Sequence, residues 1–156
     1  MKDNFNVFNK FDKDWALVTA GTIDNFNTMT ISWGEMGIVW GKKVITIFIR
    51  PDRYTFKFLK ENDDFTVSFY DEKYRKALGI LGTLSGKNVD KVKQVGFEKL
   101  EIGNSITFKE AKETYLCHKI FMQQMNYENV PDVAKKIYQN GIEPHYIIIG
   151  EIVEVK

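Results

Sequence analysis

The chain has 156 residues, the size of one ordinary domain, so we expect a single domain over residues 1–156. Its 22 Lys and Arg residues against 21 Asp and Glu give a formal net charge of +1, which argues against nucleic-acid or membrane partners held by overall charge. Hydrophobic residues make up 44% and aromatic residues 14% of the sequence, a composition that argues against a disordered chain.

Cysteine and histidine are scarce. Cys117 is the single cysteine, so an intramolecular disulfide is impossible, and with only His118 and His145 it cannot complete a four-ligand zinc site. We therefore expect no metal. The first fifteen residues lack the apolar stretch of a signal peptide, and no window approaches the roughly 20 apolar residues of a membrane span. These features predict a cytoplasmic protein.

The first half of the chain is predicted to be mostly strands. Alternating or β-branched apolar runs predict strands at Trp15–Ala20, Asn27–Trp33, Val44–Ile49 and Phe65–Tyr70. The turn residues Asp24 and Asn25 predict a hairpin between the first two strands. Gly34, Gly37 and Gly41 interrupt the stretch before the third. After Pro51, the segment Tyr54–Glu61 is predicted to be a short helix.

The second half mixes helices and strands. Helices are predicted at Glu72–Leu81 and Val89–Val95, with a third that begins at Pro131 and that Gly141 can cap. The further strands are predicted at Ile106–Phe108, Tyr115–Gln124 and Tyr146–Val155. Six or seven strands with three or four short helices predict a mainly antiparallel β-barrel with peripheral helices.

Two arginines stand where a buried strand gives way to a helix, in the sequence Arg50-Pro-Asp-Arg-Tyr-Thr55. Arg50 and Arg53 can converge on one anion through paired hydrogen bonds, and Thr55 at the helix N-terminus adds donors and a favourable dipole. The alternative is that both are solvated charges paired with Asp52 or Asp63.

The strand Thr28–Trp33 alternates small polar and bulky residues. Thr28, Thr30 and Ser32 would share one face, with Met29, Ile31 and Trp33 on the other. The polar face suits the edge of a flat heteroaromatic ligand, but an ordinary half-buried strand has the same pattern.

Three further segments are weaker candidates. The loop Thr83–Lys91, with Ser85, Gly86 and Lys91, could close over a ligand or simply connect two helices. His145 precedes an apolar strand, where it could face a pocket or be structural. Cys117 lies in an apolar strand, and we interpret it as core packing.

In this order the segments resemble the flavin reductase-like family, whose fold is the FMN-binding split β-barrel, in its flavoredoxin-like branch. The segments that carry the resemblance are Leu17–Ala20, Asn27–Gly34, Arg50–Thr55, Phe65–Phe69, Ser85–Gly86 with Asp90–Lys91, Glu110–Ala111 with Leu116–Cys117, and His145 with Ile149–Ile152.

The resemblance implies a homodimer that binds FMN and receives electrons from NADH or NADPH. It places Thr28, Met29, Thr30, Ser32 and Trp33 beside the isoalloxazine ring and ribityl chain. It assigns the phosphate to Arg50, Arg53 and Thr55, and a flavin-approaching loop to Ser85, Gly86 and Lys91. His145 takes the place of a histidine near the nicotinamide.

The function implied is an NAD(P)H-dependent flavin reductase that passes electrons to a flavin, a ferric complex or a redox partner. A non-catalytic FMN-binding electron carrier is the alternative. A small barrel that binds single-stranded nucleic acid is a third hypothesis, which the charge balance disfavours.

Overall fold

The computed structural model describes residues 7–156. The strands are β1 (Ala16–Gly21), β2 (Phe26–Ile31), β3 (Gly34–Val39), β4 (Lys42–Ile49), β5 (Asp64–Phe69), β6 (Lys99–Ile102), β7 (Ser105–Phe108), β8 (Glu113–Gln124) and β9 (Tyr146–Val155). The α-helices are α1 (Val7–Asp12), α2 (Tyr54–Glu61), α3 (Arg75–Thr83), α4 (Lys91–Val95) and α5 (Asp132–Lys135). Short 3₁₀ turns cover residues 72–74, 127–129 and 136–138.

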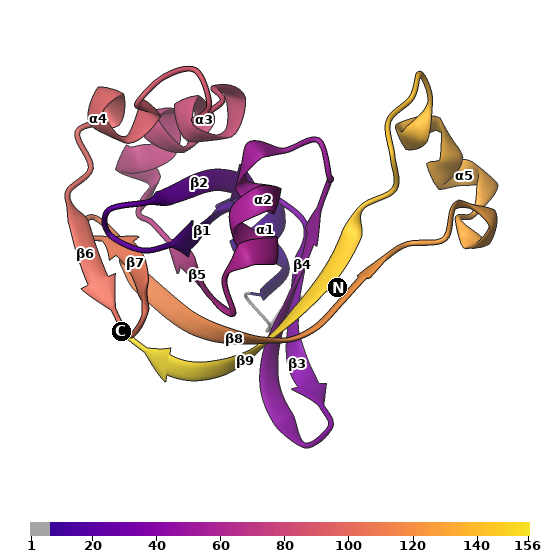
Figure 1. Cartoon of the computed structure of the whole chain (residues 1–156), viewed down its shortest axis with the longest axis horizontal. Coiled ribbons are helices and arrows are strands. Elements are labelled where there is room, and N and C mark those ends of the chain that lie inside the picture. Colours follow the sequence, from indigo (N-terminus) through magenta and orange to yellow (C-terminus); the bar gives the residue numbers. More distant parts are fainter. Residues whose placement is uncertain (1–6) are drawn as a thin grey trace.

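Seven of the strands form one antiparallel sheet in the order β2-β1-β5-β8-β9-β4-β3, and β6 pairs with β7 beside it (Figure 1). β2 and β3 lie at opposite edges of this sheet, yet only Ser32 and Trp33 separate them along the chain. The sheet must therefore curl until its two edges approach each other. Because β2 and β3 are not paired, the barrel stays open there, which is the split barrel that the sequence predicts.

Apolar residues cover both faces of β1, and every residue of that strand is buried. Val18 belongs to the core inside the barrel, with Ile47, Phe65 and other apolar side chains. Leu17 points the other way, into a second cluster beneath α3 and α4. Two apolar layers on one strand explain why this run reads as continuously hydrophobic, not alternating.

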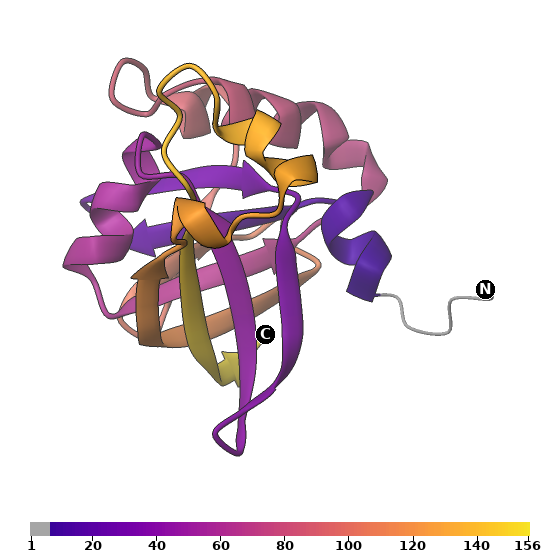
Figure 2. The same cartoon turned by 90° about the vertical axis from the view of Figure 1, so that its right-hand side faces the viewer.

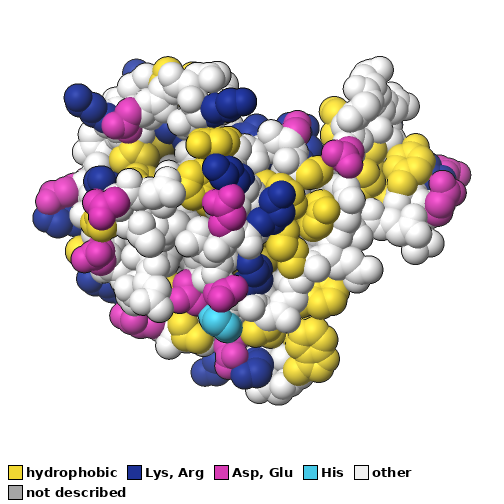
Figure 3. All heavy atoms as spheres, viewed as in Figure 1, with side chains coloured by type: hydrophobic (Ala, Val, Ile, Leu, Met, Phe, Trp, Pro, Cys, Tyr) yellow, Lys and Arg dark blue, Asp and Glu magenta, His cyan; other side chains and the backbone are white. Residues whose placement is uncertain are grey.

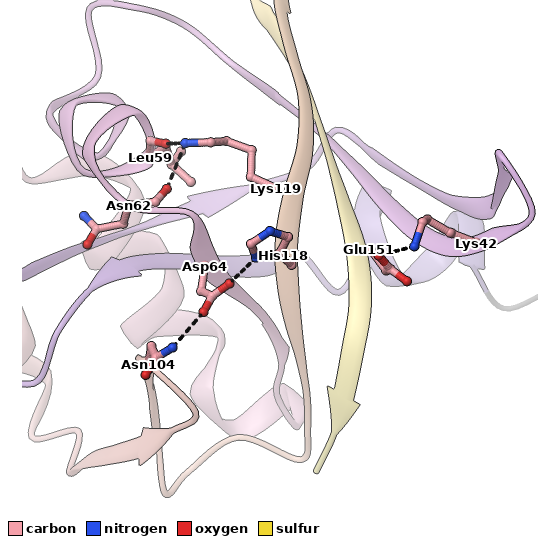
Figure 4. Close-up of polar contacts among 8 residues, drawn as sticks. All are labelled: Lys42, Leu59, Asn62, Asp64, Asn104, His118, Lys119 and Glu151. Atoms are coloured by element: carbon pink, nitrogen blue, oxygen red, sulfur yellow. Dashed lines mark hydrogen bonds and ion pairs between the residues drawn. The ribbon is translucent and has the colours of Figure 1, made fainter.

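Helix α2 packs on the barrel and is held by a lysine at its C-terminal end. Phe56, Phe58 and Leu59 are buried against the barrel. At its C-terminal end, Lys119 of β8 donates from Nζ to the carbonyl oxygens of Leu59 (2.6 Å) and Asn62 (2.8 Å), as Figure 4 shows. A cation at a helix C-terminus satisfies unpaired carbonyls and complements the helix dipole. These contacts fix the C-terminal end of α2 to β8.

The predicted helix at 54–61 is confirmed to the residue, and most predicted strands shift by only one or two positions. β3, β6 and α1 were not predicted. The glycines that interrupt the sequence before β4 lie in or beside β3, and Gly34 is required there because a Cβ would fall 2.3 Å from the Phe11 ring. The prediction of Gly141 as a helix cap is wrong. The α-helix ends at Lys135 and a 3₁₀ turn continues it to Tyr138.

Residues 125–145 leave the barrel between β8 and β9. Figure 1 shows this segment, with α5, projecting to the right of the barrel, and Figure 2 shows it crossing in front of the strands. We call it the excursion. Within residues 7–156, no helix has the length and apolar character that a bilayer crossing requires.

Candidate functional site

A small pocket of about 130 Å³ lies where the end of β4 and the start of α2 meet the loop that follows α3. We call it the cationic pocket. Its walls are formed by Asn27, Met29, Arg50, Asp52, Arg53, Tyr54, Thr55, Thr83, Leu84, Ser85, Gly86 and Lys91. Seven residues predicted from separate parts of the sequence therefore share one cavity: Met29, Arg50, Arg53, Thr55, Ser85, Gly86 and Lys91.

The two arginines are held differently. Nε of Arg50 pairs with Oδ1 of Asp52 at 3.1 Å, which is one of the partners that the alternative interpretation named. Nη2 of Arg53 donates to the Gly82 carbonyl at 2.6 Å, which ties α2 to the end of α3. Burial and the charge of Arg50 lower the pKa of Arg53, although Asp52 opposes this shift. Each contact uses only part of the guanidinium, so both arginines keep N–H groups for an anion.

The first turn of α2 adds neutral donors. Arg53 is the N-cap residue, and no side chain caps the helix. The Arg53 and Phe56 amides donate to backbone carbonyls, which leaves the amides of Tyr54 and Thr55 as the free donors of the first turn. The buried Thr55 hydroxyl accepts a hydrogen bond from Asn27 Nδ2 at 2.8 Å and keeps its own proton as a donor. An uncapped helix N-terminus beside two arginines favours a phosphate group or a carboxylate.

Lys91 is a buried cation in the same pocket. Its side chain is 3% exposed, and Nζ donates to the carbonyl oxygens of Leu81 (2.7 Å) and Leu84 (3.0 Å). An ammonium has three donors, so one is left. Burial, and then the charge of Arg53, lower the pKa of Lys91 to about 8. A bound anion would favour the charged form of Lys91 and so oppose both the effect of burial and the repulsion from Arg53.

Gly86 brings the loop onto the barrel. A Cβ on this residue would fall 2.0 Å from Asn27 Oδ1, so only glycine allows the backbone to lie against that amide. Ser85 beside it is exposed, and its Oγ accepts a bond from the Lys87 amide. The loop is therefore a packed wall of the pocket and more than a plain connector.

A second, wider cavity of about 360 Å³ adjoins the cationic pocket and shares Met29, Arg50 and Arg53 with it. We call it the wide cavity. Its other lining residues are Thr30, Ile31, Ser32, Trp33, Phe48, Gly82, Ile137 and His145. It lies at the ends of β2 and β4, beside the split in the barrel, and Ile137 and His145 reach it from the excursion. The cationic pocket thus adjoins a largely apolar cavity wide enough for a flat ring.

His145 is oriented by two aromatic neighbours. Its Nδ1 lies 2.9 Å from the Tyr138 hydroxyl, and its ring lies against Trp33 with centroids 4.7 Å apart. Burial, and then the charge of Arg50, lower the pKa of His145 to about 4, with Asp52 opposing. The ring is therefore neutral near pH 7. If Tyr138 donates its proton to Nδ1, then Nε2 carries the hydrogen and is a donor.

Thr28 is the predicted residue that the structure separates from both cavities. Its hydroxyl is buried in the barrel wall, where it donates to the Val18 carbonyl (3.0 Å) and bonds the Thr19 hydroxyl (2.8 Å). Met29, from the opposite face, lines both cavities. Met29 and Ile31 pack into the barrel core, as the prediction of a bulky core face requires. The polar face is not the only one that lines the cavities, however, because Met29, Ile31 and Trp33 line the wide cavity together with Thr30 and Ser32.

Sequence reasoning missed Asn27 as a site residue. It is 6% exposed, bonds Thr55 and contacts Gly86. The available signal was an amide at the start of an apolar strand, which needs a partner when buried. Cys117 is buried as predicted, and burial raises the pKa of its thiol to about 12. Among residues 7–156, no three His, Cys, Asp or Glu side chains gather as metal ligands would.

Comparison with known proteins identifies the family to which the chain belongs. No curated protein matches the sequence. Among solved structures, the flavoredoxin from Methanosarcina acetivorans matches with a TM-score of 0.73 and 19% identity over 92% of this chain and 67% of that one. An FMN-binding protein from Thermus thermophilus with bound 1-cyclohex-2-enone matches with a TM-score of 0.71 and 19% identity (91% and 68% of the two chains). A split barrel domain protein from Shewanella frigidimarina NCIMB 400 matches with a TM-score of 0.72 and 15% identity over 96% of this chain and 70% of that one.

These likenesses between structures concern the fold, because the identities are low. The family model described as flavin reductase like domain matches residues 8–156, which is nearly the whole chain and includes every residue of both cavities. The chain belongs to the flavin reductase-like family.

Proposed function

We propose that the chain is an FMN-binding oxidoreductase, which takes electrons from NADH or NADPH and passes them to a free flavin, a ferric complex or a redox partner. One observation carries the proposal: the cationic pocket opens into the wide cavity through shared walls at Met29, Arg50 and Arg53. A mononucleotide with a phosphate at one end and a flat ring at the other has this same order of groups.

The residues present fit that ligand. Arg50, Arg53 and Lys91 would balance the phosphate charge, while Thr55 and the uncapped amides of α2 would donate to its oxygens. Gly86 leaves backbone where a Cβ would intrude. Met29, Trp33 and His145 would border the ring. Bound FMN supplies the hydride-accepting ring, so no side chain has to act as a strong acid or base.

A pyridine nucleotide needs access to one face of that ring. Trp33 is 43% exposed at the rim of the wide cavity, and the neutral His145 offers a hydrogen-bond donor without a competing positive charge. These features support direct reduction by NADH or NADPH. The alternative, an FMN-binding electron carrier without that step, needs only the cavities and no nicotinamide position.

The decisive experiment is an absorbance spectrum of the purified protein with FMN, before and after anaerobic addition of NADH or NADPH. We expect a bound-flavin spectrum that is bleached by at least one of the two donors. Binding without bleaching would support the carrier. Failure to retain or rebind FMN would remove both proposals.

Replacement of His145 by alanine is expected to leave FMN affinity unchanged and to slow reduction by NAD(P)H about tenfold, the effect of one lost hydrogen bond of about 1.4 kcal/mol. Anaerobic stopped-flow absorbance measures the rate. His118→Ala is the matched control, because His118 lies on the surface paired with Asp64 and should react at the wild-type rate. Unaltered kinetics in His145→Ala would return this residue to a structural role.

We further propose that two copies associate through the apolar surface beside the wide cavity. A groove of about 920 Å³ there is lined by Phe8, Phe11, Met36 and others, and it shares Ser32, Trp33 and Phe48 with the wide cavity. Figure 3 shows hydrophobic side chains between the barrel and the excursion and again at the tip of the β3–β4 hairpin. Large apolar surface of this kind marks an interaction site.

We expect sedimentation equilibrium to give the mass of a homodimer. Phe8 is 62% exposed in the single chain, so Phe8→Asp should shift the mass toward the monomer without unfolding the barrel. Val133→Asp, which changes another exposed apolar residue on the excursion, is the control. A wild-type monomer at every concentration would refute the proposed association.

A further inference from the structure

Asn27 separates the cationic pocket from a third cavity. The third cavity is an outer groove of about 780 Å³ on the other side of the loop that follows α3. Asn27, Gly86 and Lys91 line both the groove and the cationic pocket. The buried Asn27 amide is fixed between the Thr55 hydroxyl, 2.8 Å away, and the Gly86 backbone. The Asn27–Gly86 contact is therefore the wall at which the cationic pocket ends.

The outer groove has the character of a nucleotide site. Phe26 and Val89 provide apolar surface, and the amides of Asn25 and Asn88 provide donors and acceptors. The charged residues of the groove are four lysines and three carboxylates: Lys87, Lys91, Lys93, Lys99, Asp24, Asp90 and Glu98. Lys87 and Lys93 form no ion pair within the described part of the chain, whereas Glu98 is paired with Lys109. A volume of several hundred cubic ångströms with apolar walls and a few polar groups is typical of small-molecule sites.

We infer that Asn27 determines cofactor size: its contact with Gly86 restricts the site to a flavin mononucleotide and keeps the adenylate half of a flavin dinucleotide out of the outer groove. This inference rests on the proposed function. FMN ends at its phosphate, which the cationic pocket would enclose. FAD continues from that same phosphate through a second phosphate to adenosine, so it has to pass the wall between the two cavities.

The contact is costly to displace in the native chain. Moving the Asn27 amide breaks its buried bond to Thr55, and moving the loop breaks the two bonds from Lys91 to Leu81 and Leu84. Buried polar groups that lose their hydrogen-bond partners destabilise the folded state. Removing the Asn27 side chain opens the wall without breaking the Lys91 contacts, because Lys91 bonds other carbonyls.

The test is titration of the apo protein with FMN and with FAD, followed by isothermal calorimetry or flavin fluorescence. We expect the wild type to bind FMN at least tenfold more tightly than FAD. Asn27→Ala should reduce this ratio at least tenfold, chiefly by improving the affinity for FAD. Asn27→Ser, which retains a small polar side chain at this strand position, is the second variant should alanine impair folding.

Two controls separate the bulk of the Asn27 side chain from its hydrogen bond to Thr55. Thr55→Val removes the bond that fixes the Asn27 amide but leaves the amide itself in the wall, so the FMN-to-FAD affinity ratio should fall less than in Asn27→Ala. Adding Lys93→Glu to Asn27→Ala should cost affinity for FAD and not for FMN, since Lys93 lines only the outer groove among the cavities described.

The outcomes are distinct. FMN binding with an equal wild-type affinity for FAD, or an unchanged ratio in both Asn27 variants, overturns this inference and leaves the proposed function intact. Binding of neither flavin overturns both. A ratio reduced in Asn27→Ala and restored by Lys93→Glu supports the assignment of the groove to the adenylate half.

Discussion

The double variant Arg50→Ala with Arg53→Ala is expected to bind FMN about 10³-fold more weakly than the wild type. Both guanidinium groups line the cationic pocket, and both keep N–H groups beyond their contacts with Asp52 and the Gly82 carbonyl. A hydrogen bond to a charged group contributes about 1.5–3 kcal/mol, so two such losses amount to about 4 kcal/mol. Calorimetric titration of the apo protein with FMN measures the change.

A fall in FMN affinity has to be separated from general loss of charge or of fold. Lys57→Ala with Lys60→Ala also removes two positive charges, from the helix that the arginines precede and at residues that do not line the cationic pocket, and should leave FMN affinity nearly unchanged. Riboflavin lacks the phosphate, so the arginine variant should lose little affinity for it. The apo melting temperature should fall only slightly, through the lost Gly82 contact. Equal FMN affinity in the double variant would place the phosphate elsewhere.

Replacement of Lys91 by methionine is expected to weaken FMN binding roughly 30-fold, from about 2 kcal/mol of lost charge-assisted bonding. Methionine approximates the length of the lysine stem but has no charge and no donor. The Leu81 and Leu84 carbonyls lose their partner, so the loop that carries Gly86 also loses its anchor. Lys93→Met, two residues along the same helix, is the matched control and should bind FMN as the wild type does.

The same lysine predicts a pH dependence. The pKa of Lys91 is lowered to about 8 in the free protein, and a bound phosphate dianion would raise it by adding a nearby opposite charge. Below about pH 8 the amine is already protonated, so binding takes up no proton there. Above that value each FMN bound requires proton uptake, and affinity falls as pH rises.

Between about pH 7 and about pH 9 we expect FMN affinity to fall roughly tenfold, as a single site with a pKa near 8 requires. Calorimetry at several pH values measures the change, and Lys91→Met should flatten it. A slope that persists in that variant would assign the titration to another group.

Local sequence was sufficient for elements that local interactions define. Tyr54–Glu61 was predicted to the residue because Pro51 precedes it and its apolar residues recur at helical spacing. β9 was predicted equally well from ten residues of strand pattern. β3 and β6 were not predicted. Half of the residues of each are exposed, and these segments become strands only by pairing with β4 and β7.

The sequence by itself determined which chemical groups this protein brings to its site: two arginines at a helix start, a glycine in a basic loop and a histidine before the last strand. Only the tertiary structure decided which of them meet. Thr28 and Thr30 have the same parity along β2, yet Thr28 bonds Val18 and Thr19 inside the wall while Thr30 reaches the wide cavity. Strand alternation specifies a face of the sheet, whereas the curl of the open barrel and the layer of α3 specify what that face meets.

The contacts of Asn27 and Lys91 in the cationic pocket likewise could not be predicted from the sequence. Their partners, Thr55 and the Leu81 and Leu84 carbonyls, lie on other elements, and no spacing in the sequence links them. The wall between the two cavities exists because burial requires each of these polar groups to find a partner, and folding alone decides which partner is within reach.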